Sequence, residues 1–382
     1  MHPLAQTLRC TDEQAMLLES ASAFCRERSP VARVRALLGT HPGHDPAVWD
    51  EIVGLGWCGI AVPEAHGGSG LDLAHVAAVT EPMGRHLLAT PFVSSQLAIQ
   101  GLLAGGDAAL QAEWLPRLSQ GLPATVALWE AEGSWELLAP VCSARREAGG
   151  VVLDGVKTLV ADAGVADLLL ASVLVDGEPA VAVIPASALP AGARRPEVVI
   201  DETRRVFRVD LHGVRLPSGS LITGAPALAA LRAVRDAGLL LACAEATGGL
   251  AAVLALTVDY LNLRSAFGRK IGSYQSLKHT CAEILVGLER ARSHLWHAAT
   301  LLAEGADAEV ALRMAKVEAG DSFVFAGDRA VQFHGGFGFT WECDAQLYLR
   351  RALWLQYAFG DAAHHRRRLA DRLLASAEPL AA

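Results

Sequence analysis

The fold is decided by residues 264–275, which read RSAFGRKIGSYQ, together with residues 332–338, which read QFHGGFG. A guanidinium such as that of Arg264 binds phosphate through charge-assisted, bidentate hydrogen bonds. The paired glycines Gly335 and Gly336 allow backbone N–H groups to approach an anion without a Cβ in the way. Both stretches thus contain groups whose chemistry suits contact with phosphate.

The composition is that of a folded protein with a large core. Apolar residues make up 52% and charged residues 19% of the 382 residues, and abundant Ala and Leu favour helix. The longest apolar runs, Gly238–Ala244 and Val165–Val175, fall far short of the ~20 residues that span a bilayer, so no membrane segment is expected. The net charge of −8 argues against nucleic acid as a partner.

The seven cysteines are scattered along the chain without a CxxC pair. This pattern predicts reduced thiols, with neither a disulfide framework nor a metal site. The first residues lack a charged segment followed by an apolar one, so no secretory signal is expected, and the predicted location is the cytoplasm.

Periodicity divides the chain into three predicted domains: 1–122 all-α, 123–222 β, and 223–382 a helical bundle. The first opens with an N-cap pattern at Thr11, and Gly121-Leu-Pro123 ends it. In the middle part, short β-branched runs punctuated by Gly and Pro predict a small barrel or sandwich. These runs are 151–156, 168–175, 180–184, 198–200 and 206–211. From Ala225 on, the helical period returns.

Residues 264–275 and 332–338 resemble the R-x-x-F-G-x-x-[IL]-x-x-x-Q and Q-x-x-G-G-x-G signatures of the acyl-CoA dehydrogenase family. The resemblance extends to residues 57–70, WCGIAVPEAHGGSG, and to Gly155-Val-Lys157. It implies an α+β fold with an N-terminal helical domain, a middle β-barrel or sandwich domain and a C-terminal four-helix bundle. The order of the three predicted domains agrees with that fold.

The resemblance also implies FAD as the cofactor and an acyl-CoA thioester as the substrate, which is desaturated between Cα and Cβ. An electron-transfer flavoprotein is the implied electron acceptor. In the family the two signatures clamp the FAD of a neighbouring subunit. The residues of this chain that match them are Arg264, Phe267, Tyr274, Gln275, Gln332, Gly335 and Gly336.

The catalytic base is missing from both of the positions that the family uses. Base-bearing members carry a carboxylate 24 residues after the first glycine of the Gly-Gly pair, and that position is Phe359, followed by Gly360. A second branch carries the base 26 residues before the signature arginine, and that position is Gly238. Two readings of Glu245, two helical turns beyond Gly238, remain open: a substitute base, or a buried carboxylate paired with an arginine.

The middle domain departs from the family as well. Aligning on Lys157 places Leu159 and Ala161 where the family packs Trp and Thr against the flavin. Residues 129–134, WEAEGS, resemble a shortened form of the flavin-binding loop, in which Glu130 is kept. The alternative is a shift of one or two residues in the alignment of this loop.

Three polar features have less specific readings. His334 beside Gly335 is predicted to contact the flavin diphosphate or to pack the loop. His364-His365 followed by three arginines is interpreted as a basic, solvated helix end. Asp236, after Arg235, is interpreted as solvated or ion-paired.

The groups that the family offers to a neighbour's flavin are intact, whereas the chain's own base and flavin contacts are altered. This pattern resembles the partner subunits of α2β2 acyl-CoA dehydrogenases that act on sterol side-chain thioesters, and it predicts a subunit that completes the FAD site of a base-bearing homologue. The alternatives are a homo-oligomeric dehydrogenase with Glu245 as its base, and a flavin-free protein that binds acyl thioesters or serves assembly.

Overall fold

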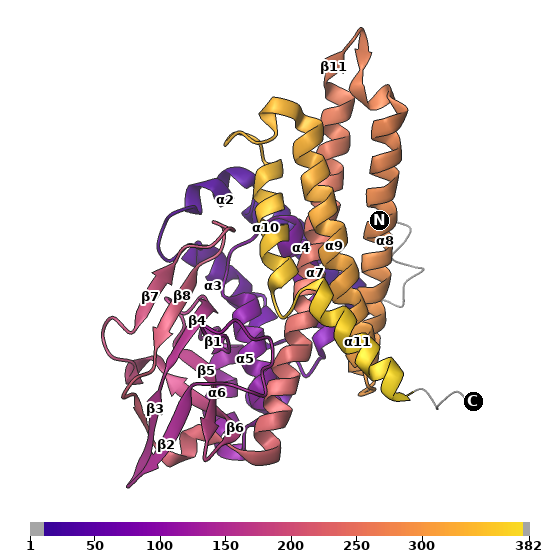
Figure 1. The fold of residues 1–382 in the computed structure, drawn as a ribbon. Helices are drawn as coiled ribbons and strands as arrows, with labels where there is room; N and C mark the ends of the chain where they lie inside the picture. Colours follow the sequence, from indigo (N-terminus) through magenta and orange to yellow (C-terminus); the bar gives the residue numbers. More distant parts are fainter. Residues whose placement is uncertain (1–10, 377–382) are drawn as a thin grey trace, which may run out of the picture. The chain divides into compact units, whose positions relative to one another are not determined.

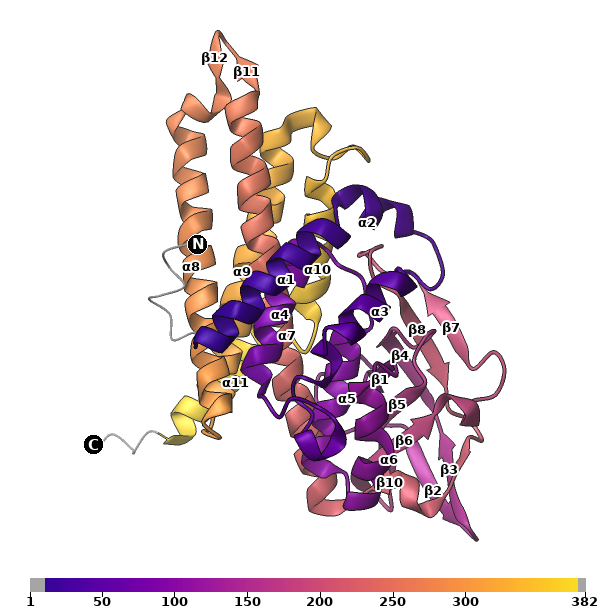
Figure 2. The same ribbon diagram turned by 180° about the vertical axis from the view of Figure 1, so that it is seen from behind.

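The computed structural model describes residues 11–376. The chain forms two compact units, each built from segments that are separate in the sequence. Unit 1 comprises Met1–Ala32, Ala77–Leu88 and Leu239–Ala382, and unit 2 comprises Arg33–Val76 and Ala89–Gly238. Figures 1 and 2 show their helices and strands from opposite sides. The domain boundaries at residues 122 and 222 stay predictions.

Besides parts of α4 (Leu73–Arg85) and α7 (Gly224–Leu263), unit 2 contains helices that precede its strands in the sequence. They are α2 (Val31–Leu37, which starts at the end of unit 1), α3 (Pro46–Gly54), α5 (Phe92–Gly105) and α6 (Ala108–Ser119). Asp45 caps α3 by accepting from the N–H of Ala47 at 3.0 Å, and Asp107 caps α6 by accepting from Leu110 at 2.9 Å. Such caps satisfy N–H groups that a helix leaves unpaired.

The strands of unit 2 form two sheets within the described residues. The larger has the order β10-β6-β5-β2-β3-β9 with β1 paired to β5, and the smaller has the order β4-β8-β7. Their core is made of small and branched apolar side chains such as Leu153, Leu169, Ile184 and Phe207. The strand bounds are β1 Ala124–Ala127, β2 Ser143–Glu147, β3 Gly150–Asp154, β4 Val156–Ala161, β5 Leu168–Val175, β6 Glu178–Pro185, β7 Arg194–Glu197, β8 Val206–Asp210, β9 Arg215–Leu216 and β10 Leu221–Ile222.

The strand predicted at 198–200 is wrong. The edge strand β7 ends at Glu197, and the side chains of Val198 and Ile200 are 102% and 51% exposed. The carboxylate of Glu197 accepts hydrogen bonds from the Thr158 hydroxyl and the Leu159 N–H, both at 2.8 Å. A polar side chain therefore ends the strand, and the apolar residues after it lie outside the core.

Unit 1 is helical. Its helices are α1 (Asp12–Arg28), α4 from residue 77 onward (Leu73–Arg85), α7 from residue 239 onward (Gly224–Leu263), α8 (Gln275–Ala303), α9 (Glu309–His334), α10 (Ala345–Tyr357) and α11 (Ala362–Ser376). The predicted N-cap at Thr11 is confirmed, because Thr11 and Gln14 form a reciprocal capping box. With the sheets of unit 2, these helices confirm the predicted fold class.

Two glycines allow α4 and α7 to cross closely. A Cβ at Gly84 would collide with the backbone carbonyl of Glu245, and a Cβ at Gly248 would collide with that of Glu81. A second contact ties the same region to α10, because the Tyr348 hydroxyl donates to the carbonyl of Arg85 at 2.9 Å. The backbone around Glu245 is thus held at van der Waals distance from its neighbours.

Helix α7 is long and apolar enough to cross a membrane by length and composition alone. However, 78% of its apolar window is buried inside the protein, as in the core helix of a bundle. The six cysteines of the described residues are free, and Cys10 lies outside that range.

Candidate cofactor site

The stretch around Arg264 forms a β-hairpin between α7 and α8. Strand β11 (Ser265–Ala266) pairs with β12 (Arg269–Lys270), and the turn residues Phe267 and Gly268 have φ of 53° and 79°. Two consecutive left-handed residues are typical of the tight turn that matches hairpin twist. The Phe267 side chain is 95% exposed at the tip, and Figure 2 shows the hairpin beyond the ends of both helices.

Tyr274 braces the base of this hairpin. Its ring centroid lies 3.9 Å from the guanidinium carbon of Arg269, and its hydroxyl donates to the Ala266 carbonyl at 3.4 Å. Gln275 is exposed as the first residue of α8. The first N–H groups of a helix have no partner within it and attract anions. Gln275 therefore lies at a helix end suited to a phosphate.

The glycines after α9 have different physical roles. Gly335 has φ 63° and ψ −143°, a conformation that is costly for any residue with a Cβ. A Cβ at Gly335 or Gly336 would meet nothing within 4 Å, so the backbone here is open to a ligand. Gly338 differs, because its Cβ would collide with the Val331 carbonyl. Gln332 is exposed one turn earlier on α9.

His334 links the end of α9 to the last turn of α7, just before Arg264. Its ring stacks on that of Tyr260 in α7 with centroids 4.1 Å apart, and the Tyr260 hydroxyl donates to the His334 carbonyl at 3.4 Å. Its Nδ1 donates to the Ala330 carbonyl at 2.7 Å, and the side chain is buried. These contacts favour the loop-packing interpretation, and they bring the end of α9 beside the last turn of α7.

The resulting end of the bundle is basic, exposed and aromatic. Arg264, Arg269 and Lys270 are exposed, and the aromatic side chains of Phe337, Phe339 and Trp341 are 46%, 76% and 52% exposed. Exposed aromatic residues next to basic groups are typical of a surface that a ligand or partner covers. The guanidinium, the helix N-terminus and the open glycines fit a diphosphate with an attached aromatic ring.

Glu245 lies inside unit 1 and is only 4% exposed. Its Oε1 accepts a 2.5 Å hydrogen bond from Nη1 of Arg351, which is fully buried on α10. The carboxylate is therefore engaged by a charged partner inside unit 1. The geometry therefore favours the ion-pair reading of Glu245. Its role as a base stays a prediction.

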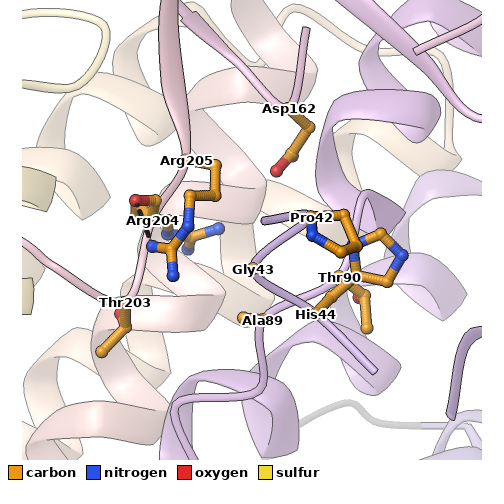
Figure 3. Close-up of a pocket in the computed structure, with 9 residues that line it drawn as sticks. All are labelled: Pro42, Gly43, His44, Ala89, Thr90, Asp162, Thr203, Arg204 and Arg205. Atoms are coloured by element: carbon orange, nitrogen blue, oxygen red, sulfur yellow. Dashed lines mark hydrogen bonds between the residues drawn. The ribbon is translucent and has the colours of Figure 1, made fainter. Parts of the chain in front are cut away.

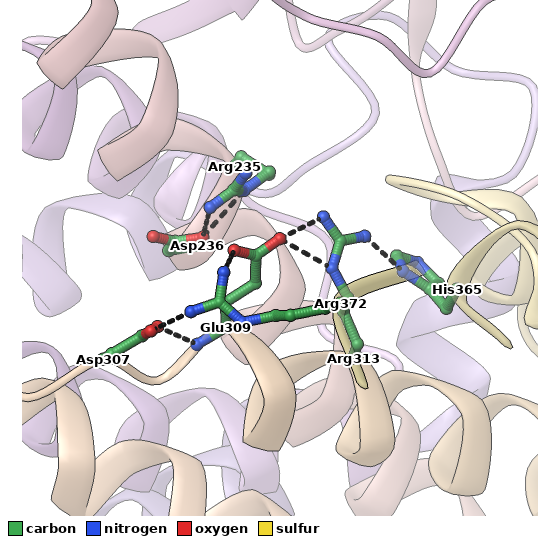
Figure 4. A network of polar contacts seen from close by, with 7 residues as sticks. All are labelled: Arg235, Asp236, Asp307, Glu309, Arg313, His365 and Arg372. Atoms are coloured by element: carbon green, nitrogen blue, oxygen red, sulfur yellow. Dashed lines mark hydrogen bonds and ion pairs between the residues drawn. The ribbon is translucent and has the colours of Figure 1, made fainter. Parts of the chain in front are cut away.

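Two further carboxylates, Glu81 and Asp236, form ion pairs. Glu81 on α4 accepts from Arg292 on α8 at 2.8 and 3.1 Å, a cross-helix pair that no local pattern indicated. Asp236 pairs with its neighbour Arg235 at 2.8 Å, as interpreted from the sequence (Figure 4).

In unit 2, Lys157 and Glu130 close the loop that resembles the flavin-binding loop. The fully buried Lys157 donates to Glu130 Oε1 at 2.7 Å, and Glu130 also accepts from the N–H groups of Val141 and Cys142 at 2.7 Å. Burial raises the pKa of Glu130, but these hydrogen bonds outweigh burial and leave its pKa below the usual value. Glu130 thus holds the loop ends together as an ionised carboxylate.

Leu159 lies at a bulge in β4. The register between β4 and β8 shifts between Lys157 and Val160, and Leu159 has φ 52° with its side chain 40% exposed. Thr158 N–H donates to the Trp129 carbonyl at 2.9 Å, which sets the loop beside this strand. At this position unit 2 therefore presents an aliphatic side chain, with Ala161 half-buried two residues on.

A small polar pocket in unit 2 was not expected from the sequence (Figure 3). Its volume is about 10 Å³, enough for one water molecule. Arg205 forms one wall and donates to backbone carbonyls of Leu37, Thr40, Glu202 and Arg204. Because these hydrogen bonds engage the Arg205 guanidinium with the backbone, we interpret its role as structural and not as ligand binding. Its lining residues are Pro42, Gly43, His44, Ala89, Thr90, Asp162, Thr203, Arg204 and Arg205.

Family models match both helical regions of the chain. Residues 11–122 match the acyl-CoA dehydrogenase N-terminal domain, and residues 236–374 match the acyl-CoA dehydrogenase C-terminal domain. These matches cover well over half of the sequence. The chain belongs to the acyl-CoA dehydrogenase family.

Similar proteins span nearly the whole chain. The acyl-CoA dehydrogenase IpdE2 of Mycolicibacterium smegmatis is 29% identical over 90% of this chain and 93% of its own length. The structure of the ChsE4-ChsE5 complex from Mycobacterium tuberculosis matches with a TM-score of 0.88 and 25% identity, over 96% of this chain and 98% of that chain. The structure of the Tcur3481-Tcur3483 steroid ACAD (G363A variant) matches with a TM-score of 0.85 and 26% identity, over 95% of this chain and 98% of that chain.

Family membership makes this an FAD-dependent acyl-CoA dehydrogenase. The residues at the hairpin end fit the cofactor by their chemistry. The two usual base positions carry no carboxylate: Phe359 lies half-buried after α10, and Gly238 lies buried within α7. Among the residues that the structure describes, no group of three or more His, Cys, Asp or Glu side chains could hold a metal ion.

Proposed function

We propose that this chain is the partner subunit of a heteromeric acyl-CoA dehydrogenase. It completes the FAD site of a homologous, base-bearing chain in an α2β2 assembly that desaturates a bulky acyl-CoA thioester. FAD accepts the hydride from the β-carbon when it is bound. The other chain supplies the carboxylate that removes the α-proton.

One observation carries this proposal: all of the residues that match the two family signatures are present, while the base position is apolar. We call these residues the clamp: Arg264, Phe267, Tyr274, Gln275, Gln332, Gly335 and Gly336. The hairpin, the α8 N-terminus and the open glycines lie together at one end of unit 1, with exposed cations and aromatics. The turn after α10 carries Phe359 in place of a carboxylate, and Glu245 is engaged by Arg351. A chain that served its own flavin would need the base as well as the clamp.

The similar proteins support the same assignment. The ChsE4-ChsE5 structure is that of a complex, and the Tcur3481-Tcur3483 protein is named as a steroid ACAD. We transfer from them a two-chain assembly and a bulky acyl group. The cytoplasm and an electron-transfer flavoprotein complete the proposal as location and electron acceptor.

In this role the residues of the chain bind and orient. Arg264 would hold phosphate oxygens bidentately, the N–H groups at Gln275 and Gly335–Gly336 would donate to the remaining oxygens, and Phe267 would supply an apolar contact. These are contacts to the non-reacting end of FAD. They contribute to catalysis by fixing the cofactor's position.

The proposal is tested by reconstitution. This chain and a base-bearing homologue are purified separately and together, and dye reduction is followed with a sterol side-chain acyl-CoA and with butyryl-CoA. The expected result is activity only with both chains, and higher with the sterol substrate. Full activity of this chain alone would refute the subunit role, and equal activity on butyryl-CoA would refute the bulky-substrate assignment.

A further inference from the structure

The turn between α10 and α11 is held in a costly backbone conformation. Phe359 has φ 59° and Gly360 has φ 114°, and the Gly360 N–H donates to the Tyr357 carbonyl at 3.1 Å. A bulky residue in the left-handed region is a conformational outlier that persists only where its surroundings enforce it. Something other than local preference must therefore hold Phe359.

Lys316 bonds the chain on both sides of Phe359. Its Nζ donates to the carbonyls of Gln356 and Gly360, each at 3.0 Å. The Gln356 carbonyl lies in the last turn of α10, where carbonyls lack helical partners and a cation is favourable. The ammonium thus joins the helix end to the residue that follows Phe359.

Burying this ammonium has a cost that the turn must offset. Lys316 is 4% exposed on α9, and burial lowers its pKa to about 8. The charged and titratable groups that face it are Cys243 of α7, Asp321 of α9, Asp361 of the turn and His365 of α11. Its two hydrogen bonds go to the end of α10 and to Gly360 of the turn, so this segment supplies the polar partners that a buried amine requires.

His365 forms the other wall of the turn. It is 1% exposed, which corrects its interpretation as part of a solvated helix end, and a Cβ at Gly360 would lie 2.8 Å from its Nε2. Its Nδ1 accepts from Arg313 at 3.2 Å, and burial lowers its pKa to about 3, so the ring is neutral. Figure 4 shows Arg313 held in turn by Glu309, at 2.8 and 3.1 Å.

We propose that Lys316 is a positioning residue that locks residues 358–361 and thereby orients the side chain at position 359. The turn that contains position 359, where other family members carry the base, is therefore held in one conformation although the residue here is phenylalanine. The lock lies wholly within this chain and needs neither cofactor nor partner, so its test is independent of the proposed subunit role.

The test is amide hydrogen exchange of the full chain, comparing wild type with Lys316→Met. Methionine keeps the length and apolar stem of the side chain and removes the donors, so the bundle remains packed. Lys278→Met, at an exposed position on α8, is the matched control. Exchange of peptides covering 354–366 is compared with that of peptides from α8 and the rest of α9, between pH 6 and 9.5 and corrected for intrinsic rates.

In Lys316→Met, protection of residues 358–361 is expected to fall at least tenfold while the other peptides keep theirs. In wild type, protection of the turn is expected to fall as the pH rises through about 8 and Lys316 loses its charge. Lys316→Met is expected to lack the pH step, because it has no ammonium to lose, and Lys278→Met is expected to behave as wild type, with the step and without the tenfold loss. An unchanged turn in Lys316→Met, or an equal loss throughout α8 and α9, would overturn the proposal.

Discussion

The hairpin end of unit 1 and the turn after α10 differ in burial as much as in chemistry. At the hairpin end the functional groups are exposed, and the backbone is shaped by glycines with open space around them. At the turn the backbone is enclosed by Lys316 and His365, which are 4% and 1% exposed. The exposed hairpin end is suited to contact with another molecule, and the enclosed turn is suited to fixing the side chain at position 359.

At the turn the backbone conformation is present without a catalytic carboxylate, whereas at the hairpin end all of the residues that match the family signatures are present. The turn keeps Gly360, its left-handed backbone and its buried lysine, yet position 359 offers no carboxylate. The hairpin end has both its exposed cations and its open glycines. The base is absent from the turn and the flavin contacts of unit 2 are altered, whereas the residues that match the two signatures are intact, and a division of labour between two subunits predicts this pattern.

The largest effect is expected from breaking the Glu245–Arg351 pair. Glu245→Gln leaves the fully buried Arg351 without its charged partner, which costs about 3–5 kcal/mol of unfolding free energy. Chemical denaturation of the chain measures this directly. The assembled dehydrogenase should keep its activity wherever the variant remains folded.

The double variant Glu245→Leu/Arg351→Met separates structure from catalysis. Replacing both charges by apolar groups is expected to recover most of the lost stability. A Glu245→Gln chain of unchanged stability that abolishes activity would instead identify Glu245 as a base.

A smaller loss is expected at the clamp from Arg264→Gln. The hydrogen bonds of a guanidinium to phosphate contribute about 1.5–3 kcal/mol, so FAD should bind the assembled complex roughly 10- to 100-fold more weakly. Flavin fluorescence during dilution measures the affinity. Arg290→Gln, which removes an exposed ion pair with Glu318 on the same helical unit, should leave it unchanged.

The turn should also make the chain sensitive to acid. Burial lowers the pKa of His365 to about 3 and that of the half-buried His86 to about 4. The unfolded chain therefore binds more protons than the folded one between these values and pH 6.5, so stability falls as the pH falls through that window. His365→Leu should flatten the dependence of unfolding free energy on pH. An unaltered slope would contradict the buried, neutral state of His365.

The smallest change is expected from Phe359→Glu in the chain alone. It restores a carboxylate to a rigid turn, but the altered flavin contacts of unit 2 remain. No dehydrogenase activity should appear without the partner chain. Turnover by Phe359→Glu alone, absent in a Phe359→Gln control, would show that this chain holds a working flavin by itself.

Features encoded in contiguous residues could be predicted from the sequence. The Thr11 cap arises from a few neighbouring residues whose backbone preferences are specific, whereas the hairpin at 265–270 was not among the expected elements. The partners of buried charges could not be predicted in this way. Arg351 meets Glu245 from a helix 106 residues away, and Arg292 meets Glu81 from 211 residues away.

The errors of interpretation have the same origin. The basic run suggested a solvated helix end, and Arg366 and Arg367 are indeed exposed on α11, but His365 itself is buried against α9. Apolar residues at 198–200 suggested a strand, but the hydrogen bonds of Glu197 end the sheet before them. In both cases tertiary contacts decided an outcome that local composition left ambiguous.

The most direct test of the account is the ratio of FAD to protein, from visible absorbance after gel filtration, for this chain alone and for the chain co-expressed with a base-bearing homologue. We expect a ratio of FAD to protein near zero for this chain purified alone, and about one FAD per pair of unlike chains in the complex. A ratio near one per chain for this protein alone would contradict it, and would place a complete flavin site within a homo-oligomer.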